Sequence, residues 1–212
     1  MLVTLNKFRR RQATADPLVF LPGDFQHLTQ VVALSLKDDE CEDAILPAAI
    51  RTARRSYPYK GEAIDTTLCL TNKRRLMINE IENGRLAPVG AIPCVYKGSD
   101  PRAQSMLLWP GLKISAGQTN RKHGLKNALS WVVESVNIDW CTLARGETRL
   151  TIPTVEVAGL FRLAHALTID SSQTLTLQGR VLLVESDHKH FSLRRLIVAL
   201  GRVPRADMIH VQ

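Results

Sequence analysis

The dipeptide Asn83-Gly84 is the feature that most constrains how this chain can fold. Asn-Gly between alternating apolar runs is a strong signal for a two-residue β-hairpin turn. One such run covers residues 63–71 and another covers residues 76–82, with the polar stretch Asn72–Arg75 between them as a second turn. Pro88, Gly90 and Pro93 make the next segment an edge strand or a bulged strand. The pattern predicts an antiparallel meander over residues 63–97.

Helical signals lie on both sides of this meander. Acidic residues precede residues 44–57, arginines lie near the end of that segment and Pro58 follows it, which is the usual polarity of a helix. Leu125, Leu129, Val132 and Val136 recur at helical spacing and predict a helix over about residues 120–137. Further helices are expected over residues 154–167, capped by Thr154, and from Ser192 to a stop at Gly201.

These elements predict an α+β protein with a strand-rich, antiparallel N-terminal half followed by a helix-rich C-terminal half. Further strands are expected over residues 1–8, 29–36, 105–114 and 208–211, and one or two around Gly179. Residues 98–104 are the best candidate for a boundary. The division is then a strand-rich region with one helix, 1–100, and a basic helix and strand region, 101–212, unless the whole chain is a single domain.

Composition narrows the partners and the compartment. The net charge is +8 and the isoelectric point is about 9.6, which favours a polyanionic partner. The four cysteines contain no CxxC pair, so buried free thiols and a reducing, cytoplasmic setting are expected. No signal peptide and no apolar run of membrane-spanning length are recognisable, so the expected partners are nucleic acid and other protein subunits rather than a membrane.

Cations stand at the start of two of the expected helices. Arg121, Lys122 and Lys126 open one helix and Arg194 and Arg195 open another, although the helix macrodipole favours acids there. A phosphate group would remove this cost, because helix N–H groups and cationic side chains bind the same anion. These residues belong to two segments that contain no acid. We call residues 101–133 the first basic stretch and residues 188–206 the second basic stretch. The alternative is that the cations pair with distant acids or face water.

The sequence therefore predicts a non-catalytic nucleic-acid-binding protein, plausible as one subunit of a nucleoprotein complex and without a cofactor. Neither GxxxxGK[ST] nor GxGxxG is present, which disfavours a nucleotide-driven motor or a dinucleotide enzyme. Nothing in the pattern separates DNA from RNA. The expected phosphate contacts are Arg9, Arg10, Arg11, Lys73, Arg74, Arg75, Arg102, Lys113, Arg121, Lys122, Lys126, Lys189, Arg194, Arg195, Arg202 and Arg205.

Two alternatives stay open at this point. Asp170, then a hairpin, then Asp187 and Lys189 resemble the loose pattern of PD-(D/E)xK nucleases, in which acids hold Mg²⁺ and a lysine stabilises the attacked phosphate. Glu185 could add a metal ligand, but Ile169 stands where that pattern has a proline. The second alternative is a protein-interaction subunit that uses the acidic residues 38–43 to contact a basic partner.

Overall fold

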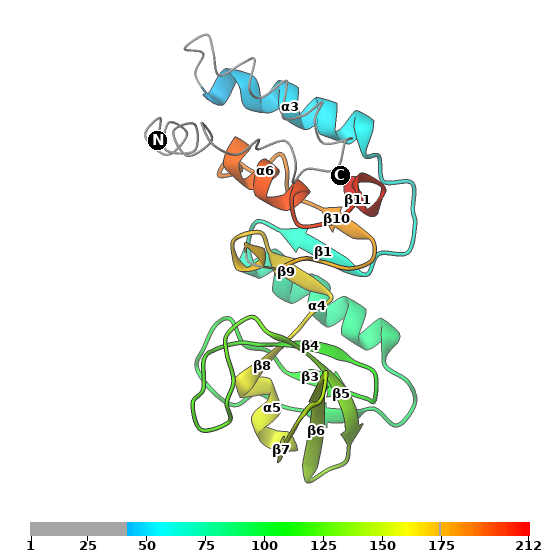
Figure 1. Ribbon diagram of the computed structural model, residues 1–212, viewed down its shortest axis with the longest axis vertical. Coiled ribbons are helices and arrows are strands. Elements are labelled where there is room, and N and C mark those ends of the chain that lie inside the picture. The colour runs from blue at the N-terminus through cyan, green and yellow to red at the C-terminus, as the bar shows by residue number, and fades with distance from the viewer. Residues whose placement is uncertain (1–41, 174) are drawn as a thin grey trace.

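The computed structural model describes residues 42–173 and 175–212, which form a parallel unit and an antiparallel unit (Figure 1). The parallel unit has four parallel strands in the order β11-β10-β1-β9. Its elements are α3 (Glu42–Ser56), β1 (Thr66–Cys69), α4 (Asn72–Leu86), β9 (Ala166–Thr168), β10 (Val181–Leu183), α6 (Leu193–Leu200) and β11 (Ile209–Val211).

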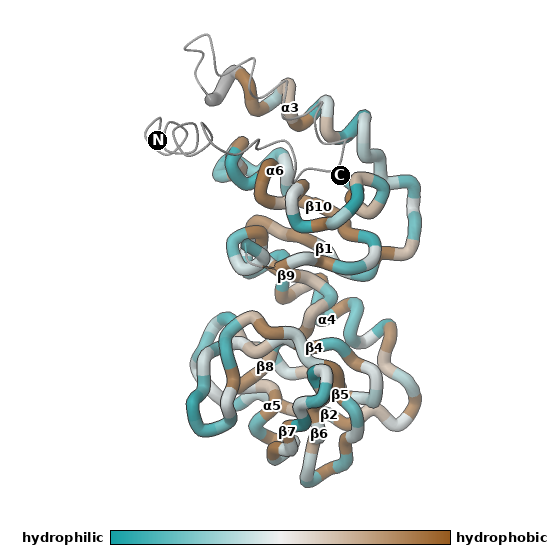
Figure 2. The backbone as a smooth tube through the Cα atoms, viewed as in Figure 1, coloured by the Kyte–Doolittle hydropathy of each residue, from teal (hydrophilic) through white to brown (hydrophobic). Residues whose placement is uncertain are grey.

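Helices cover both faces of the parallel sheet because its strands are apolar on both sides. Leu68 and Leu183 pack with α3 and α6 on one face, while Cys69 and Val184 lie on the other face, where α4 packs. Parallel sheets are usually buried in this way. Figure 2 shows hydrophobic stretches along β1, β10 and α6, with hydrophilic stretches in the connecting turns. Because the four strands are parallel, their carboxyl ends lie at one edge of the sheet, where α/β proteins bind ligands.

The antiparallel unit is inserted between α4 and β9. It contains a five-stranded sheet of order β7-β6-β5-β4-β8 and the strand pair β2-β3. Its elements are β2 (Ile92–Cys94), β3 (Met106–Leu108), β4 (Lys113–Ala116), β5 (Ser130–Val136), β6 (Trp140–Arg145), β7 (Thr148–Pro153), α5 (Thr154–Leu160) and β8 (Phe161–Leu163). Side chains alternate across the sheet, so that Trp131, Val133 and Leu143 are buried on its inner face.

The predicted antiparallel meander over residues 63–97 is wrong, although short strands form in its first and third runs, at β1 and β2. Within the described part of the chain, β1 pairs only with parallel strands, and the middle run is helical. Residues Asn72–Leu86 form the helix α4, and Asn83-Gly84 lies inside it rather than at a hairpin turn. Thr71 caps the helix by accepting a hydrogen bond from the Arg74 N–H. The buried face of α4 is polar, with Arg75, Asn79 and Asn83 at successive helical turns, so the usual apolar stripe of a helix is missing from the sequence.

The predicted helix over residues 120–137 is also wrong. Its first part is a loop in which Gly124 has a positive φ of 65°, and its second part is the strand β5. Burial in β5 follows a period of two, with Trp131 and Val133 buried and Val132 exposed. The helical spacing of the apolar residues there was coincidental.

The predicted fold class is therefore wrong. The described residues form a mixed α/β structure with a parallel sheet, a five-stranded antiparallel sheet and the antiparallel pair β2-β3. Their C-terminal half holds most of the strands and only two of the four α-helices, so it is not helix-rich. The helix predicted over residues 154–167 is shorter: α5 ends at Leu160 and gives way to β8 and β9. Thr154 is not its cap, because the helix begins at Thr154 and Pro153 is in the cap position. The structure confirms the helices over residues 44–57 and after Ser192, and the last strand.

The other predictions of strands, boundary and cysteines have different outcomes. The strands over residues 1–8 and 29–36 and the cluster Arg9, Arg10 and Arg11 lie outside the described residues. Residues 98–104, the expected boundary, lie between β2 and β3, which pair with each other. Cys69, Cys94 and Cys141 are buried free thiols, as predicted. None of the described helices is long and apolar enough to cross a bilayer.

Candidate nucleic-acid interface

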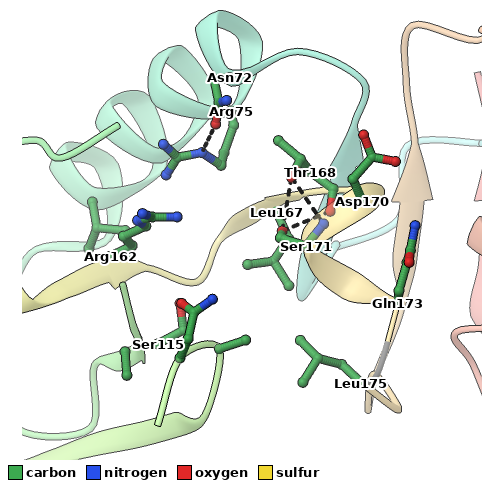
Figure 3. Close-up of a pocket in the computed structure, with 14 residues that line it drawn as sticks. Asn72, Arg75, Ser115, Arg162, Leu167, Thr168, Asp170, Ser171, Gln173 and Leu175 are labelled. Atoms are coloured by element: carbon green, nitrogen blue, oxygen red, sulfur yellow. Dashed lines mark hydrogen bonds between the residues drawn. The ribbon is translucent and has the colours of Figure 1, made fainter. Parts of the chain in front are cut away.

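A cavity of about 310 Å³, which we call the arginine cleft, lies between the carboxyl edge of the parallel sheet and the antiparallel unit. The parallel unit contributes side chains from the first turn of α4 and from the segment after β9 (Figure 3). The antiparallel unit contributes the end of β4, β8 and the end of the loop before β5. The residues that line it include Asn72, Arg75, Ser115, Ala128, Arg162 and Asp170.

Arg75 forms the innermost part of one wall. Its side chain is on the buried face of α4, and the residue is only 2% exposed. Its Nε donates to Asn72 Oδ1 at 3.2 Å and its Nη2 donates to the Arg102 carbonyl at 2.7 Å. Its Nη1 is buried and has no partner in the described part of the chain. A buried donor without a partner costs about 1–3 kcal/mol, so a small shift of the side chain toward an acceptor in the cavity would be favourable.

Arg162 forms the opposite wall. It lies on β8 directly across from Ser115 of β4, so both side chains are on the face that lines the cavity. The Arg162 side chain passes over Gly117, where an added Cβ would lie 3.0 Å from Arg162 Nε. Gly117 thus leaves room for the guanidinium group. In Figure 3 the guanidinium groups of Arg75 and Arg162 both project into the same space.

The two guanidinium groups raise each other's electrostatic cost. Burial, and then the charge of Arg162, lower the pKa of Arg75 to about 10. Burial is also the main cause that lowers the pKa of Arg162, followed by the charge of Arg102. Both side chains nevertheless stay protonated at neutral pH. An anion between them would compensate for both the desolvation and the repulsion.

Asp170 is an acid that lines the same cavity. It follows β9 in the 3₁₀ turn Asp170–Ser172, and its carboxylate lies 3.2 Å from Arg195 Nη2. Arg195 also donates to the His190 carbonyl. Because Arg195 balances the charge of Asp170, this acid does not cancel the positive potential from Arg75 and Arg162.

The loop between β4 and β5, residues 117–129, extends the positive surface beyond the cavity. Leu125 is 1% exposed and anchors the loop, whereas Arg121, Lys122 and Lys126 are exposed. The loop ends beside the cavity at Ala128, which has a left-handed φ of 66° although it is not glycine. Strained backbone of this kind is common at ligand sites.

Other predicted contacts are already occupied within the protein. Arg102 pairs with Asp100 and Arg205 pairs with Asp207. Arg202 donates to the carbonyls of Val198, Ser172, Gln173 and Leu175, so it fastens the end of α6 to the segment after β9. Arg195, paired with Asp170, and Arg75, bonded to Asn72 and to the Arg102 carbonyl, are further predicted contacts that the protein engages internally.

Eight further predicted contacts in the described part of the chain are exposed. Lys73 and Arg74 are in the first turn of α4 rather than at a hairpin tip, and Lys189 and Arg194 flank the start of α6. Lys113 is exposed on β4. It shares the face of Ser115, because residues two apart in a strand point to the same side. Lys113 therefore lies close to the arginine cleft.

The acids of the nuclease alternative make three separate contacts. The Glu185 carboxylate accepts from the backbone N–H groups of Leu70 and Thr71 at 2.9 and 3.0 Å. Asp187 pairs with Arg54, and Asp170 pairs with Arg195. Within the described residues, no three His, Cys, Asp or Glu side chains gather where they could hold a metal ion. The geometry therefore offers no support for a Mg²⁺ site built on these acids.

Comparisons with known proteins bear on the fold. No protein-family model matches the sequence, and no curated protein matches it. In its fold, the chain resembles Pif1 helicases. It matches Bacteroides Pif1 bound to single-stranded DNA with a TM-score of 0.59 and 17% identity, over 90% of this chain and 49% of that one. A structure of two coordinating Pif1 helicases at forked duplex DNA gives 0.59 and 15%, over 90% and 47%.

Pif1 from Candida albicans gives a TM-score of 0.51 and 17% identity, over 88% of this chain and 53% of that one. The chain thus spans about half the length of these helicases. At such identities the likeness establishes a shared fold.

Arg162 is the cleft residue that sequence reasoning missed. It is a cation inside the largely apolar run 160–167, and it belongs to no cluster of charge in the sequence. A lone arginine within a buried apolar segment is a usable signal, because charged side chains are rarely buried without a partner. Arg75 was among the predicted contacts, but as part of an exposed turn rather than as a buried group.

Proposed function

We propose that the chain binds single-stranded nucleic acid through its phosphates, with the arginine cleft as the central contact. The observation that carries this proposal is that two arginines line one cavity, Arg162 and Arg75, and that Nη1 of Arg75 has no partner in the described residues. Arginine is well suited to phosphate, because its planar group donates two parallel hydrogen bonds.

The shape of the site favours a single strand. A cavity of about 310 Å³ accommodates a phosphate and part of one nucleotide, whereas a duplex is far too wide to enter. Lys113, Arg121, Lys122 and Lys126 are exposed on the adjoining strand and loop, where they can contact the phosphates on either side. Contacts of this type carry no sequence information, so binding should be tolerant of sequence.

The fold also supports nucleic-acid binding, and it suggests which ligand to test first. The similar Pif1 helicases were solved with single-stranded DNA or forked DNA, and we propose DNA as the first ligand to test. Their fold favours a role in a DNA-dependent motor over a passive nucleoprotein subunit. Because the sequence contains no GxxxxGK[ST] phosphate loop, we assign this chain the nucleic-acid contact and not the nucleotide site of such a motor.

The experiment is a fluorescence-anisotropy titration of labelled single-stranded DNA, single-stranded RNA and duplex DNA over a series of salt concentrations. Single strands should bind more tightly than the duplex. A plot of the logarithm of the affinity against the logarithm of the salt concentration should have a negative slope of several units, as expected if about 4–8 phosphates are neutralised. Arg162→Gln should weaken binding by about tenfold or more, since a charge-assisted contact is lost.

The matched control is Arg205→Gln. Arg205 is exposed, pairs with Asp207 and precedes β11, so it lies toward the amino edge of the sheet, away from the cleft. This variant should bind like the wild type. Equal affinities for Arg162→Gln and the wild type, or an affinity that does not change with salt, would contradict the proposal.

A further inference from the structure

The parallel and antiparallel units have separate hydrophobic cores. One set of buried side chains joins α3, α6 and the parallel sheet, and a smaller set lies under α4. The buried side chains of the antiparallel unit form a third set, which includes Ile114, Leu143 and Phe161. The described residues show no apolar cluster that continues from one unit into the other.

Hydrogen bonds from α4 hold the two units together instead. Asn83 makes a pair of bonds with the backbone of Leu107 in β3, at 3.0 and 2.8 Å. Gln104 donates to the Leu76 carbonyl and Arg75 donates to the Arg102 carbonyl. Polar interfaces within one chain usually permit relative motion of the parts that they join. The junction is therefore weaker than either core.

The arginine cleft is at this junction, with like charges on its two sides. Arg75 belongs to α4 of the parallel unit, and Arg162 belongs to β8 of the antiparallel unit. In the absence of an anion their repulsion opposes the hydrogen bonds that hold the units together. From this arrangement we infer that a phosphate group bound between Arg75 and Arg162 acts as a clasp that fastens the antiparallel unit to the parallel unit.

This inference rests on the proposed function for the origin of the phosphate, but it makes a different claim. Binding alone requires only that the cleft attract an anion. The clasp requires that the anion bind preferentially when the two units are docked, so that occupancy makes them unfold together. A nucleic-acid strand or a free phosphate ion could supply the group, and the two can be distinguished.

Two intrinsic signals report the units separately. The chain has three tryptophans, Trp109, Trp131 and Trp140, and all of them are in the antiparallel unit, so tryptophan fluorescence follows the unfolding of that unit. The longer helices, α3, α4 and α6, belong to the parallel unit, so the helical circular-dichroism signal follows that one. Urea unfolding is recorded with both signals on the same chain.

Without ligand, we expect the two transitions to have different midpoints. A single-stranded oligonucleotide or inorganic phosphate should bring the midpoints together, whereas sodium chloride at equal ionic strength should not. An effect of phosphate alone would assign the clasp to a free anion, and an effect of the oligonucleotide would assign it to the strand.

Arg162→Gln is the decisive variant, because it removes the repulsion and one half of the clasp without touching the hydrogen bonds from α4. Its fluorescence midpoint without ligand should equal or exceed that of the wild type, and ligand should no longer bring the midpoints together. Arg75→Lys is the second variant. It retains the positive charge but loses the guanidinium and its bond to the Arg102 carbonyl. Its response to ligand is therefore measured from its own ligand-free midpoints, and that response should be weaker than in the wild type.

Two outcomes would overturn the clasp. The first is coincident transitions in the ligand-free wild type, because the units would then already unfold as one. The second is an oligonucleotide that binds in a salt-dependent way and leaves the midpoints apart, which would refute the clasp while the proposed function stands. Absence of any nucleic-acid binding and of any response to phosphate would refute both.

Discussion

The first and second basic stretches look alike in the sequence but differ in the structure. Neither contains an acid, and both were expected to place cations at a helix start. In the first stretch, the cations Arg121, Lys122 and Lys126 lie on an exposed loop, and none of them has an ion-pair partner in the described residues. In the second, Arg195, Arg202 and Arg205 are engaged by Asp170, by backbone carbonyls and by Asp207.

This difference shows why a local shortage of acids is a poor guide to free positive charge. Backbone carbonyls are acceptors that leave no trace in the sequence, and Arg202 uses four of them. Asp170 is far from Arg195 in the chain but adjacent in space. Arg195 and Arg202 of the second stretch therefore stabilise the parallel unit, whereas the loop cations of the first stretch remain free to meet a ligand beside the arginine cleft.

The largest expected effect tests the structural role of the second stretch. Arg202→Met removes the donor that satisfies the carbonyls of Ser172, Gln173 and Leu175, and it leaves those acceptors partly buried. We expect a loss of about 2–3 kcal/mol in the free energy of unfolding, as is usual for hydrogen bonds to a charged group. Urea denaturation measures this loss.

The control for that experiment is Arg205→Met in the same stretch. Its pair with Asp207 is fully exposed, and exposed pairs contribute little, so no measurable change in stability is expected. If Arg202→Met were as stable as Arg205→Met, the second stretch could not be described as structural. A large loss for Arg205→Met would equally remove the distinction between its members.

A smaller effect should arise in the first stretch, and on binding rather than on stability. The double change Arg121→Glu and Lys122→Glu should weaken single-stranded DNA binding by about tenfold at low salt and reduce the salt slope by about two units. A salt-dependent anisotropy titration measures both quantities. Because residues 117–129 form a loop and no helix begins at Arg121, the gain in stability expected from a helix macrodipole is absent.

Thermal melts of the same variant complete this test. An unchanged melting temperature with weaker binding is the expected result. A destabilised variant that binds like the wild type would mean that the two cations have a structural role, as Arg202 does, and the contrast between the stretches would fail.

The errors in the sequence-based prediction have the same origin as this contrast. α4 was overlooked because its buried face carries Arg75, Asn79 and Asn83, whose partners are backbone groups of distant segments. Asn79, for example, makes bonds of 3.1 and 2.7 Å with the backbone of Ala166. Sequence periodicity detects burial through apolar residues, so a helix that buries amides and a guanidinium group is not recognised.

The parallel sheet could not be predicted for a topological reason. Its first strand, β1, pairs with β9 and β10, and the whole antiparallel unit lies between them in the chain. Local signals were correct at α6 but wrong at Asn83-Gly84, which lies inside α4. The Ser192 cap and the Gly201 stop of α6 are at their predicted positions, because capping depends on residues within one turn. The cleft combines side chains from both units, so its existence was beyond reach of local patterns.

The smallest expected effect concerns Lys113, a free cation of the first basic stretch that lies outside the loop. It is exposed on β4, on the same face as Ser115, and no described residue forms an ion pair with it. Lys113→Gln should lower the affinity for single-stranded DNA by less than about threefold and reduce the salt slope by about one unit at most, as for one peripheral phosphate contact. The anisotropy titration described above resolves a change of this size. If Lys113→Gln weakened binding as much as Arg162→Gln, the strand would run over the exposed face of β4, and the cleft would not be the central contact.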